Sequence, residues 1–319
     1  MHYDIFNGDS DGICALHQLR LDTPCPDAIL ITGPKRDITL LSTLQDVKQS
    51  SLTVLDLSLE SNRPFLEELL SNSNEILYID HHFSGVIPET PALTVHINTS
   101  PDTCTSLIVD SLLQGRYRKW AIVAAFGDNL HDAALKAAQT LSLSRQELKQ
   151  LQELGELLNY NGYGATLADL YFHPADLYRA IRPFADPLDF INSSPEAITL
   201  LRQGFQQDML LALRQKAVNP GNINRIFHFP DTAWSRRVCG VFANLKAQEK
   251  KEAAHALIVD NEDSTLRISV RAPLADKKKA DALCRAFPTG GGRAAAAGIN
   301  KLPPEMLDEF ITAFHATYD

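Results

Sequence analysis

The stretch Asp4-Ile5-Phe6-Asn7-Gly8-Asp9-Ser10-Asp11-Gly12 places two carboxylates between a short apolar run and an amphipathic segment. Residues 4–7 are predicted to form a buried strand, and residues 13–21, which follow the acidic loop, are predicted to form a helix. Ligands of an open parallel sheet bind beyond the carboxyl ends of its strands. The loop that carries Asp9 and Asp11 is therefore the first candidate site.

The same alternation continues through the first 130 residues. Further strands are predicted at residues 28–32, 52–57 and 76–80, and further helices at residues 40–47 and 63–70. Strands that alternate with helices at this spacing form βαβ units around a mostly parallel sheet. The predicted fold class is α/β, with a doubly wound sheet domain, a helical connector and a second, smaller α/β domain.

The remainder of the chain divides at a change of periodicity. Residues 104–218 are predicted to be helical, with a helix start at Cys104-Thr105-Ser106, an interruption at residues 159–164 and a long helix at residues 195–217. Asn219-Pro220-Gly221-Asn222 is typical of a turn, and the strands predicted after it are residues 223–229, 256–260 and 266–270. The predicted domains are a catalytic domain at 1–135, the connector at 136–218 and a substrate domain at 219–319.

Composition limits the classes of function. Among 319 residues, 30 Lys and Arg stand against 39 Asp and Glu, which gives a net charge of −9 and disfavours a general affinity for long nucleic acid. The five cysteines are odd in number and form no CxxC pair, which favours a reducing compartment. No signal peptide or membrane span is recognisable. We expect a cytoplasmic protein with no membrane partner.

Three more clusters of acidic and histidine residues follow predicted strands or a helix end. They are Asp56, the triplet Asp80-His81-His82, and Asp128. Carboxylate oxygens mixed with imidazole suit Mn²⁺ or Mg²⁺. Two such ions about 3.5–4 Å apart can clamp a phosphoryl displacement and activate a water molecule.

Each cluster also has a structural interpretation. An Asp-x-Asp-Gly sequence is often a helix cap or a turn, and Asp128 alone could be a helix cap. Asp56 is harder to explain in this way, because a carboxylate buried in an apolar run is costly without a partner. The coincidence of four clusters at one sheet edge favours the metal site.

The order of these motifs resembles that of the DHH phosphoesterase family. The segment Thr289-Gly290-Gly291-Gly292-Arg293-Ala294-Ala295-Ala296-Ala297-Gly298 is similar to the glycine-rich motif of the family's DHH-associated C-terminal domain. The two sets of motifs together span nearly the whole chain.

The resemblance implies a site with two Mn²⁺ ions, for which Mg²⁺ is an alternative. Asp9 would hold the first ion, Asp11 the second, and Asp56 would bridge both, while His81 and Asp128 would complete the second.

The resemblance also implies roles around the metals. His82 would face the scissile phosphate, and Asp80 would orient a histidine. Many members have a histidine where this chain has Ile5, so Asn7 becomes the nearest polar side chain for the first ion.

In the C-terminal domain, Gly290, Gly291 and Gly292 would let a phosphate approach the backbone at the start of an Ala-rich helix. Arg271 resembles the family's substrate-binding arginine, and Arg293 replaces a histidine that is common there. The active site would lie in the cleft between the two domains.

The function expected from this resemblance is a Mn²⁺-dependent hydrolase of phosphodiester or phosphomonoester bonds that acts by two-metal activation of water. Its substrates would be short nucleotides, namely short oligoribonucleotides, adenosine bisphosphate or cyclic dinucleotides. The alternatives are a single-strand-specific exonuclease and a catalytically silent nucleotide-binding regulatory module. A homodimer is compatible with the sequence, although no surface segment argues for it.

Overall fold

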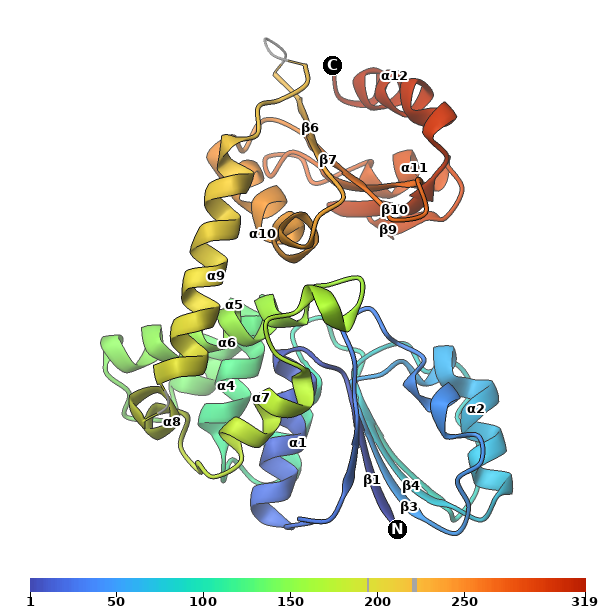
Figure 1. Cartoon of the computed structure of the whole chain (residues 1–319), viewed down its shortest axis with the longest axis vertical. Coiled ribbons are helices and arrows are strands. Elements are labelled where there is room, and N and C mark those ends of the chain that lie inside the picture. The colour runs from blue at the N-terminus through green and yellow to red at the C-terminus, as the bar shows by residue number, and fades with distance from the viewer. Residues whose placement is uncertain (194, 220–222) are drawn as a thin grey trace. The chain divides into compact units, whose positions relative to one another are not determined.

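The computed structural model describes residues 1–193, 195–219 and 223–319, and the chain divides into two compact units. The units are Met1–Gln203 and Gly204–Asp319, and each contains its own five-stranded sheet (Figure 1). The division falls within helix α9 (Pro195–Arg214), which the sequence places in the connector. Part of the predicted turn, residues 220–222, lies outside the described residues.

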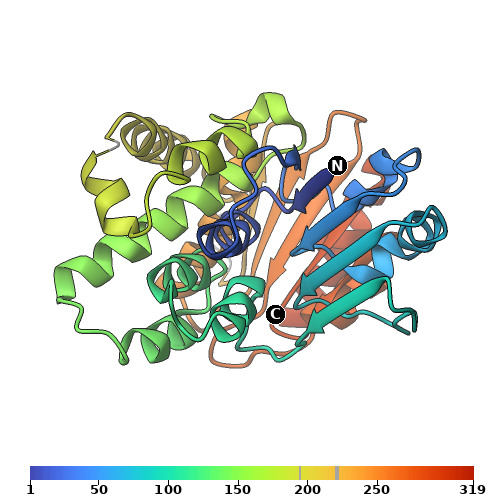
Figure 2. The same ribbon diagram turned by 90° about the horizontal axis from the view of Figure 1, so that it is seen from below.

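The sheet of the first unit is entirely parallel, with the strand order β2-β1-β3-β4-β5. Its strands lie side by side in the view of Figure 2. They are β1 (His2–Phe6), β2 (Ile29–Ile31), β3 (Ser51–Leu55), β4 (Glu75–Asp80) and β5 (Leu93–Ile97). The predicted doubly wound sheet and its first four strands are confirmed. Strand β5 was not predicted because it is an edge strand whose residues are at most half-buried, which leaves no apolar run.

The register aligns the carboxyl ends of the central strands. Phe6 of β1 pairs with Leu55 of β3, and Leu55 pairs with Ile79 of β4. The chain passes from β1 to β2 on one side and returns to β3 on the other, so a topological switch point lies between β1 and β3. Crevices at such switch points bind ligands in doubly wound sheets.

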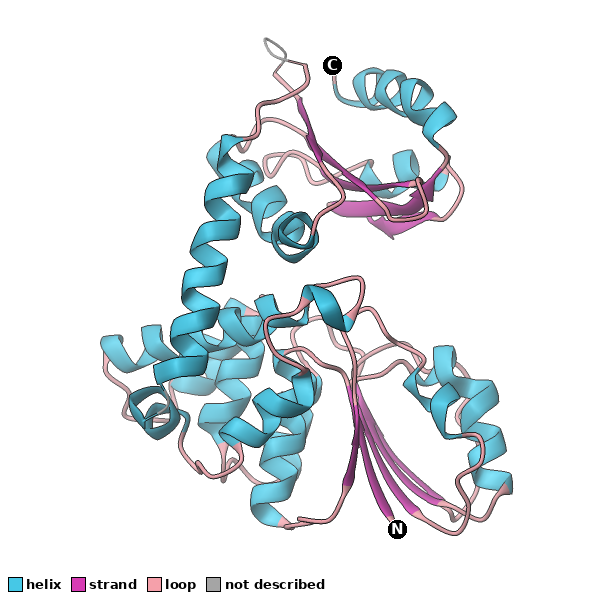
Figure 3. Cartoon of the chain, viewed as in Figure 1, coloured by secondary structure: helices cyan, strands magenta, loops and turns pink. Residues whose placement is uncertain are grey.

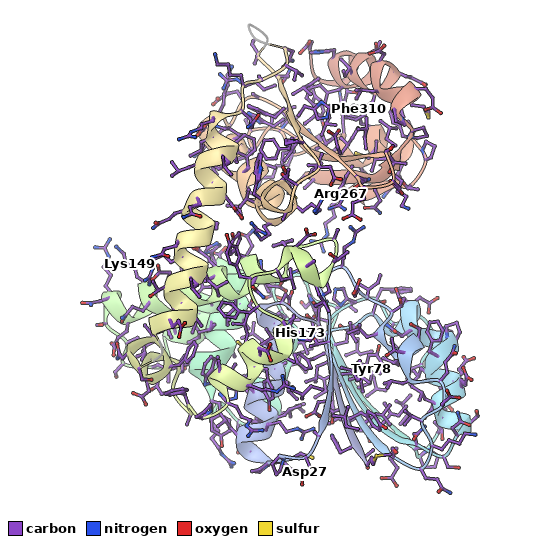
Figure 4. All side chains as sticks on the ribbon, in the orientation of Figure 1. Asp27, Tyr78, Lys149, His173, Arg267 and Phe310 are labelled. Carbon is purple, nitrogen blue, oxygen red and sulfur yellow. The ribbon has the colours of Figure 1, made fainter. Side chains whose placement is uncertain are left out.

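Helices cover both faces of this sheet (Figure 3). On one face, α2 (Leu59–Ser71) and the short 3-10 helix η1 (Leu40–Leu44) bury apolar side chains against β1, β3 and β4. Tyr78 lies in this core (Figure 4), and its hydroxyl donates to the carbonyl of Leu57 at 2.8 Å. A buried polar atom is thus satisfied inside an otherwise apolar layer.

The other face carries α1 and the helices that follow β5. These helices are α1 (Ser10–Asp22), α3 (Thr105–Leu112), α4 (Arg118–Gly127), α5 (His131–Ala138), α6 (Arg145–Gly162), η2 (Leu167–Asp169), α7 (Pro174–Ile181) and α8 (Pro187–Ser193). The predicted interruption at residues 159–164 is wrong for most of its length, since α6 continues to Gly162. The amide of Asn161 exchanges hydrogen bonds with the backbone of Phe172 at 2.9 and 3.0 Å, so this polar residue docks the next loop instead of ending the helix.

The second unit has a mixed sheet with the strand order β6-β7-β8-β10-β9. Its elements are β6 (Arg225–Phe229), α10 (Ala233–Glu249), β7 (His255–Asp260), β8 (Leu266–Arg271), α11 (Ala280–Arg285), β9 (Gly290–Arg293), β10 (Ala296–Leu302), η3 (Pro304–Met306) and α12 (Leu307–Tyr318). Helices α11 and α12 pack on one face, where Phe310 is buried (Figure 4), and Phe242 of α10 packs on Phe227 and Phe229 of the opposite face. The three strands predicted after residue 219 are confirmed.

The Ala-rich helix predicted after the glycine motif is wrong. Gly290–Arg293 and Ala296–Leu302 pair as an antiparallel hairpin. In β10, Ala297 and Ile299 are buried while Gly298 between them is not, which is the period of two that a strand requires. The glycines therefore do not precede a helix N-terminus that could bind phosphate.

In residues 1–193, 195–219 and 223–319, no helix combines the length and the apolar character needed to cross a bilayer.

Close packing of α6 on α4 depends on a glycine. A Cβ atom at Gly155 would lie 2.1 Å from the carbonyl oxygen of Val123. We expect Gly155→Ala to lower the free energy of unfolding by about 1–3 kcal/mol, because the helices must separate. That loss would outweigh the gain of roughly 1 kcal/mol that alanine has over glycine inside a helix. Chemical denaturation followed by circular dichroism measures the change.

The matched control is Gly240→Ala in α10, where an added Cβ atom would meet nothing within 4 Å. It should stabilise its unit by roughly 1 kcal/mol. Stabilisation by both substitutions would contradict the packing argument.

Candidate metal centre

Six acidic and histidine side chains gather at the carboxyl edge of the first sheet. Asp9 and Asp11 come from the loop between β1 and α1, Asp56 follows β3, His81 and His82 follow β4, and Asp128 is the C-cap residue of α4. Donor atoms of Asp11, His81 and Asp128 all lie within 4.8 Å of one another. The same holds for Asp56, His81 and His82.

Asp9 and Asp11 also hold helix ends. Asp9 is the N-cap of α1, and its Oδ1 accepts hydrogen bonds from the backbone N–H groups of Asp11 and Gly12 at 3.0 and 3.1 Å. Asp11 accepts from the N–H groups of Thr105 and Ser106 at 2.8 and 2.7 Å. The helix start predicted at residues 104–106 is confirmed, but a distant carboxylate satisfies its free N–H groups.

Asp56 is the least compensated carboxylate of the centre. It is 3% exposed and has a φ of 58°, a left-handed conformation that costs non-glycine residues about 1–3 kcal/mol and concentrates at functional sites. Its Oδ1 accepts from the hydroxyl of Thr105 at 3.2 Å. Burial, together with the charges of Asp11 and Asp9, raises the pKa of Asp56 well above its ordinary value. A cation bound beside it would reverse this cost.

The two histidines face different carboxylates. His81 Nε2 lies 3.4 Å from Asp56 Oδ1 and 3.8 Å from Asp128 Oδ2. His82 Nδ1 lies 2.7 Å from Asp80 Oδ1, so Asp80 orients His82 and leaves its Nε2 for another partner. Burial lowers the pKa of His82, but the hydrogen bond and charge of Asp80 outweigh it and raise the pKa above the ordinary value.

A cationic residue that the sequence did not indicate is part of the centre. Lys35 Nζ lies 2.6 Å from Asp9 Oδ2 and 3.1 Å from Asp128 Oδ1. Burial alone would raise the pKa of Asp9, but the Lys35 ammonium outweighs it and lowers that pKa. The signal was present, because Lys35 follows the predicted strand at 28–32 just as the carboxylates follow theirs.

Two positions considered for the first metal ion, Asn7 and Ile5, differ in whether they offer a ligand atom. Asn7 Nδ2 donates to the carbonyl of Lys35 at 3.2 Å, whereas its buried Oδ1 has no hydrogen-bond partner in the described part of the chain. Ile5 is fully buried in the core between the sheet and α2 and offers no ligand atom. The carboxylates and imidazoles that remain are a donor set that suits Mn²⁺ or Mg²⁺.

The predicted substrate arginines share one face of the second sheet. Arg271 of β8 pairs with Ala296 of β10, which pairs in turn with Arg293 of β9. Residues directly opposite one another in antiparallel strands project from the same face, so the two guanidinium groups arise two strands apart, roughly 10 Å. Arg271 Nε also donates to Asn244 Oδ1 of α10 at 2.8 Å.

The glycines of the motif serve packing in part. A Cβ atom at Gly290 would lie 1.7 Å from the carbonyl oxygen of Cys284 in α11, whereas one at Gly291 would meet nothing within 4 Å. Gly292 has a φ of 135°, which side chains rarely adopt.

Comparison with solved structures identifies proteins of the same fold. Exonuclease RecJ bound to manganese matches with a TM-score of 0.65 at 14% identity, covering 99% of this chain and 89% of that one. A DHH domain protein described as a member of a family of ribosomal proteins matches with a TM-score of 0.63 at 13% identity, covering 99% of this chain and 86% of that one. The pGpG-specific phosphodiesterase PggH from Vibrio cholerae matches with a TM-score of 0.53 at 13% identity, covering 99% of this chain and 98% of that one. No protein-family model matches the chain, and no curated protein matches it in sequence.

The fold is therefore that of the DHH-domain proteins, and RecJ exonuclease and PggH share it. The resemblance drawn from the motifs is confirmed for the fold. None of these similarities supports a homodimer.

The ion pair of His82 leads to a prediction about its titration. We expect Asp80→Asn to lower the pKa of His82, because the neutral amide removes the charge that favours the imidazolium. The ring would then lose its proton at a lower pH than in the wild type. NMR titration of the histidine ring protons in metal-free protein measures the shift.

Asp110→Asn is the control, since Asp110 is another buried carboxylate of this unit and pairs with Arg118 instead. It should leave the His82 midpoint unchanged. An unaltered midpoint in Asp80→Asn would show that Asp80 does not set the charge of His82.

Proposed function

We propose that the protein is a divalent-metal-dependent phosphoesterase that hydrolyses phosphodiester or phosphomonoester bonds of short nucleotides. The observation that carries this proposal is the presence of two overlapping groups of potential metal ligands at the sheet edge. They are Asp11, His81 and Asp128, and Asp56, His81 and His82, and within each group the donor atoms lie within 4.8 Å of one another. We propose Mn²⁺ or Mg²⁺ as the ion. The similarity to manganese-bound RecJ supports the choice of a divalent metal.

A divalent cation held by these residues would supply a Lewis acid for a phosphoryl oxygen and would lower the pKa of a water molecule. Hydrolysis would form a bond from a water oxygen to phosphorus and break the bond from phosphorus to the ester oxygen, and the attacking water would release a proton to the solvent. The raised pKa of His82 keeps its ring protonated to higher pH. We propose that Nε2 of His82 donates its proton to the leaving oxygen, while Asp80 holds the ring in place.

The second unit would bind the anionic parts of the substrate. Arg271 and Arg293 share one face of its sheet, and guanidinium groups bind phosphate through paired hydrogen bonds. We propose that Gly291, beside which there is open space, lets a phosphate approach the backbone. Short nucleotides are favoured over long polymers because the net charge of −9 opposes extended phosphate contacts.

Asp56 is the residue whose loss should affect turnover most. We expect Asp56→Asn to lower the rate of hydrolysis about a hundredfold or more. Mutation of residues that only hydrogen-bond to metal ligands already lowers activity by roughly 10- to 100-fold. Asparagine suits the test better than alanine, because it tolerates the positive φ at this position. Steady-state hydrolysis with saturating Mn²⁺ measures the effect, and a melting curve verifies the fold.

Asp110→Asn again serves as the control, because it removes a buried carboxylate outside the centre and should leave turnover nearly unchanged. Full activity in Asp56→Asn would remove Asp56 from the mechanism.

A panel of substrates tests the substrate class. We expect Mn²⁺-dependent hydrolysis of at least one of adenosine 3′,5′-bisphosphate, a linear diribonucleotide and a cyclic dinucleotide, with products resolved by chromatography. The similarity to a pGpG-specific phosphodiesterase makes the linear dinucleotide the first choice. If every short substrate survives and an EDTA-treated sample behaves identically, the enzymatic proposal fails and the silent nucleotide-binding module takes its place.

The second candidate is a single-strand-specific exonuclease, which the similarity to RecJ exonuclease favours. A long, end-labelled single strand separates the two candidates. Progressive shortening of the strand at a rate above that of the dinucleotide would favour the exonuclease.

A further inference from the structure

Lys35 is held rigidly beside the metal centre by its own backbone. Its N–H donates to the carbonyl of Gly162 at the end of α6 at 2.9 Å, and its carbonyl accepts from Asn7 Nδ2 at 3.2 Å. The segment that carries it packs tightly on the acidic loop, since a Cβ atom at Gly8 would lie 1.9 Å from the carbonyl oxygen of Gly33. The chain therefore fixes where this side chain begins.

The ammonium group of Lys35 lies among three side-chain oxygens. It donates hydrogen bonds to Asp128 Oδ1 at 3.1 Å and Asn159 Oδ1 at 3.2 Å, and it forms an ion pair with Asp9 Oδ2 at 2.6 Å. The ring of Tyr163 lies 5.5 Å from Nζ, within the range of a cation–π contact. The side chain is only 29% exposed. These contacts make the ammonium a resident part of the centre.

The ammonium of Lys35 lies where a cation bound to the outer oxygen of Asp9 would lie. Asp9 Oδ1 accepts hydrogen bonds at the N-terminus of α1, and Asp9 Oδ2 lies 2.6 Å from Lys35 Nζ. Accordingly, Asp9 belongs to neither of the groups of potential metal ligands found among the described residues. A metal ion bound to Asp9 Oδ2 would lie next to the ammonium of Lys35, and the two cations would repel each other. The ion could bind there only if the ammonium moved away.

We propose that Lys35 is a built-in cation that replaces one divalent ion, so that the chain binds a single divalent ion between Asp11, His81 and Asp128. The carboxylate of Asp56 borders this group, with its Oδ1 3.4 Å from His81 Nε2. This inference rests on the proposed metal-dependent function, and it departs from the two ions that the sequence motifs imply. Lys35 neutralises Asp9 and one oxygen of Asp128 permanently, whereas the remaining carboxylates depend on the divalent ion. It is a positioning residue.

The number of bound ions tests the proposal directly. Wild-type protein is equilibrated with Mn²⁺, and bound metal is counted by dialysis and elemental analysis. Electron paramagnetic resonance then distinguishes an isolated ion from a spin-coupled pair. We expect one isolated ion in the wild type. We expect two coupled ions in Lys35→Met, which keeps the length of the side chain but frees the oxygens of Asp9, Asp128 and Asn159.

The matched control is Lys119→Met. Lys119 lies in the same unit, is also 29% exposed and pairs with the carboxylate of Asp186. It should retain one isolated ion. A melting curve adds a second readout, because Lys35→Met should lose stability in EDTA and recover it with Mn²⁺ to a larger extent than either the wild type or the control.

The outcomes separate this inference from the proposed function. Two ions in wild-type protein would overturn the role of Lys35 and leave the metal-dependent function standing, whereas no bound ion would overturn both. A folded Lys35→Met that still binds one ion would also overturn the inference. If that variant does not fold, Lys35→Gln, which keeps polar atoms at the position, is counted in its place with the same expectation.

Discussion

The need to compensate several carboxylates buried at one sheet edge governs the arrangement of the first unit. A parallel sheet brings the ends of β1, β3 and β4 together, and the chain places an aspartate after or at the end of each of them. Buried carboxylates are costly unless charge or hydrogen bonds offset the loss of water. Backbone N–H groups at helix N-termini offset the cost of burying Asp9 and Asp11. The ammonium of Lys35 also offsets the cost of burying Asp9 and that of burying Asp128. Asp56 receives the least compensation from charges and hydrogen bonds, and a divalent ion beside its carboxylate would supply what is missing.

Much of this edge could be predicted because local sequence and topology agree there. The runs before Asp9, Asp56 and Asp80 are apolar and short, and each of them is a central strand with its carboxyl end at the same edge. The role of Lys35 in the metal centre could not be predicted from the sequence, for a physical reason. A lysine after a strand is usually solvated, and its role depends on Asp128 and Asn159, which approach only after α4 and α6 have packed.

The glycine motif shows where local propensity misleads. Four consecutive alanines favour a helix, yet Ala296–Leu302 is a strand, because pairing with β8 and β9 satisfies its backbone and buries Ala297 and Ile299. Tertiary pairing overrides helix propensity, which amounts to less than about 1 kcal/mol per residue. Close approach to the carbonyl of Cys284 explains Gly290, and the sequence shows the glycine without showing the group that it approaches.

The double use of the aspartates bears on what their presence in a sequence indicates. Asp9 and Asp11 hold the N-termini of α1 and α3, so a chain of this fold would need them in order to fold even without catalysis. Their presence in a sequence is therefore a weak indication of enzymatic activity. His81 and His82 hold no helix end in the described part of the chain, so these two positions indicate chemistry at the site better than the aspartates do.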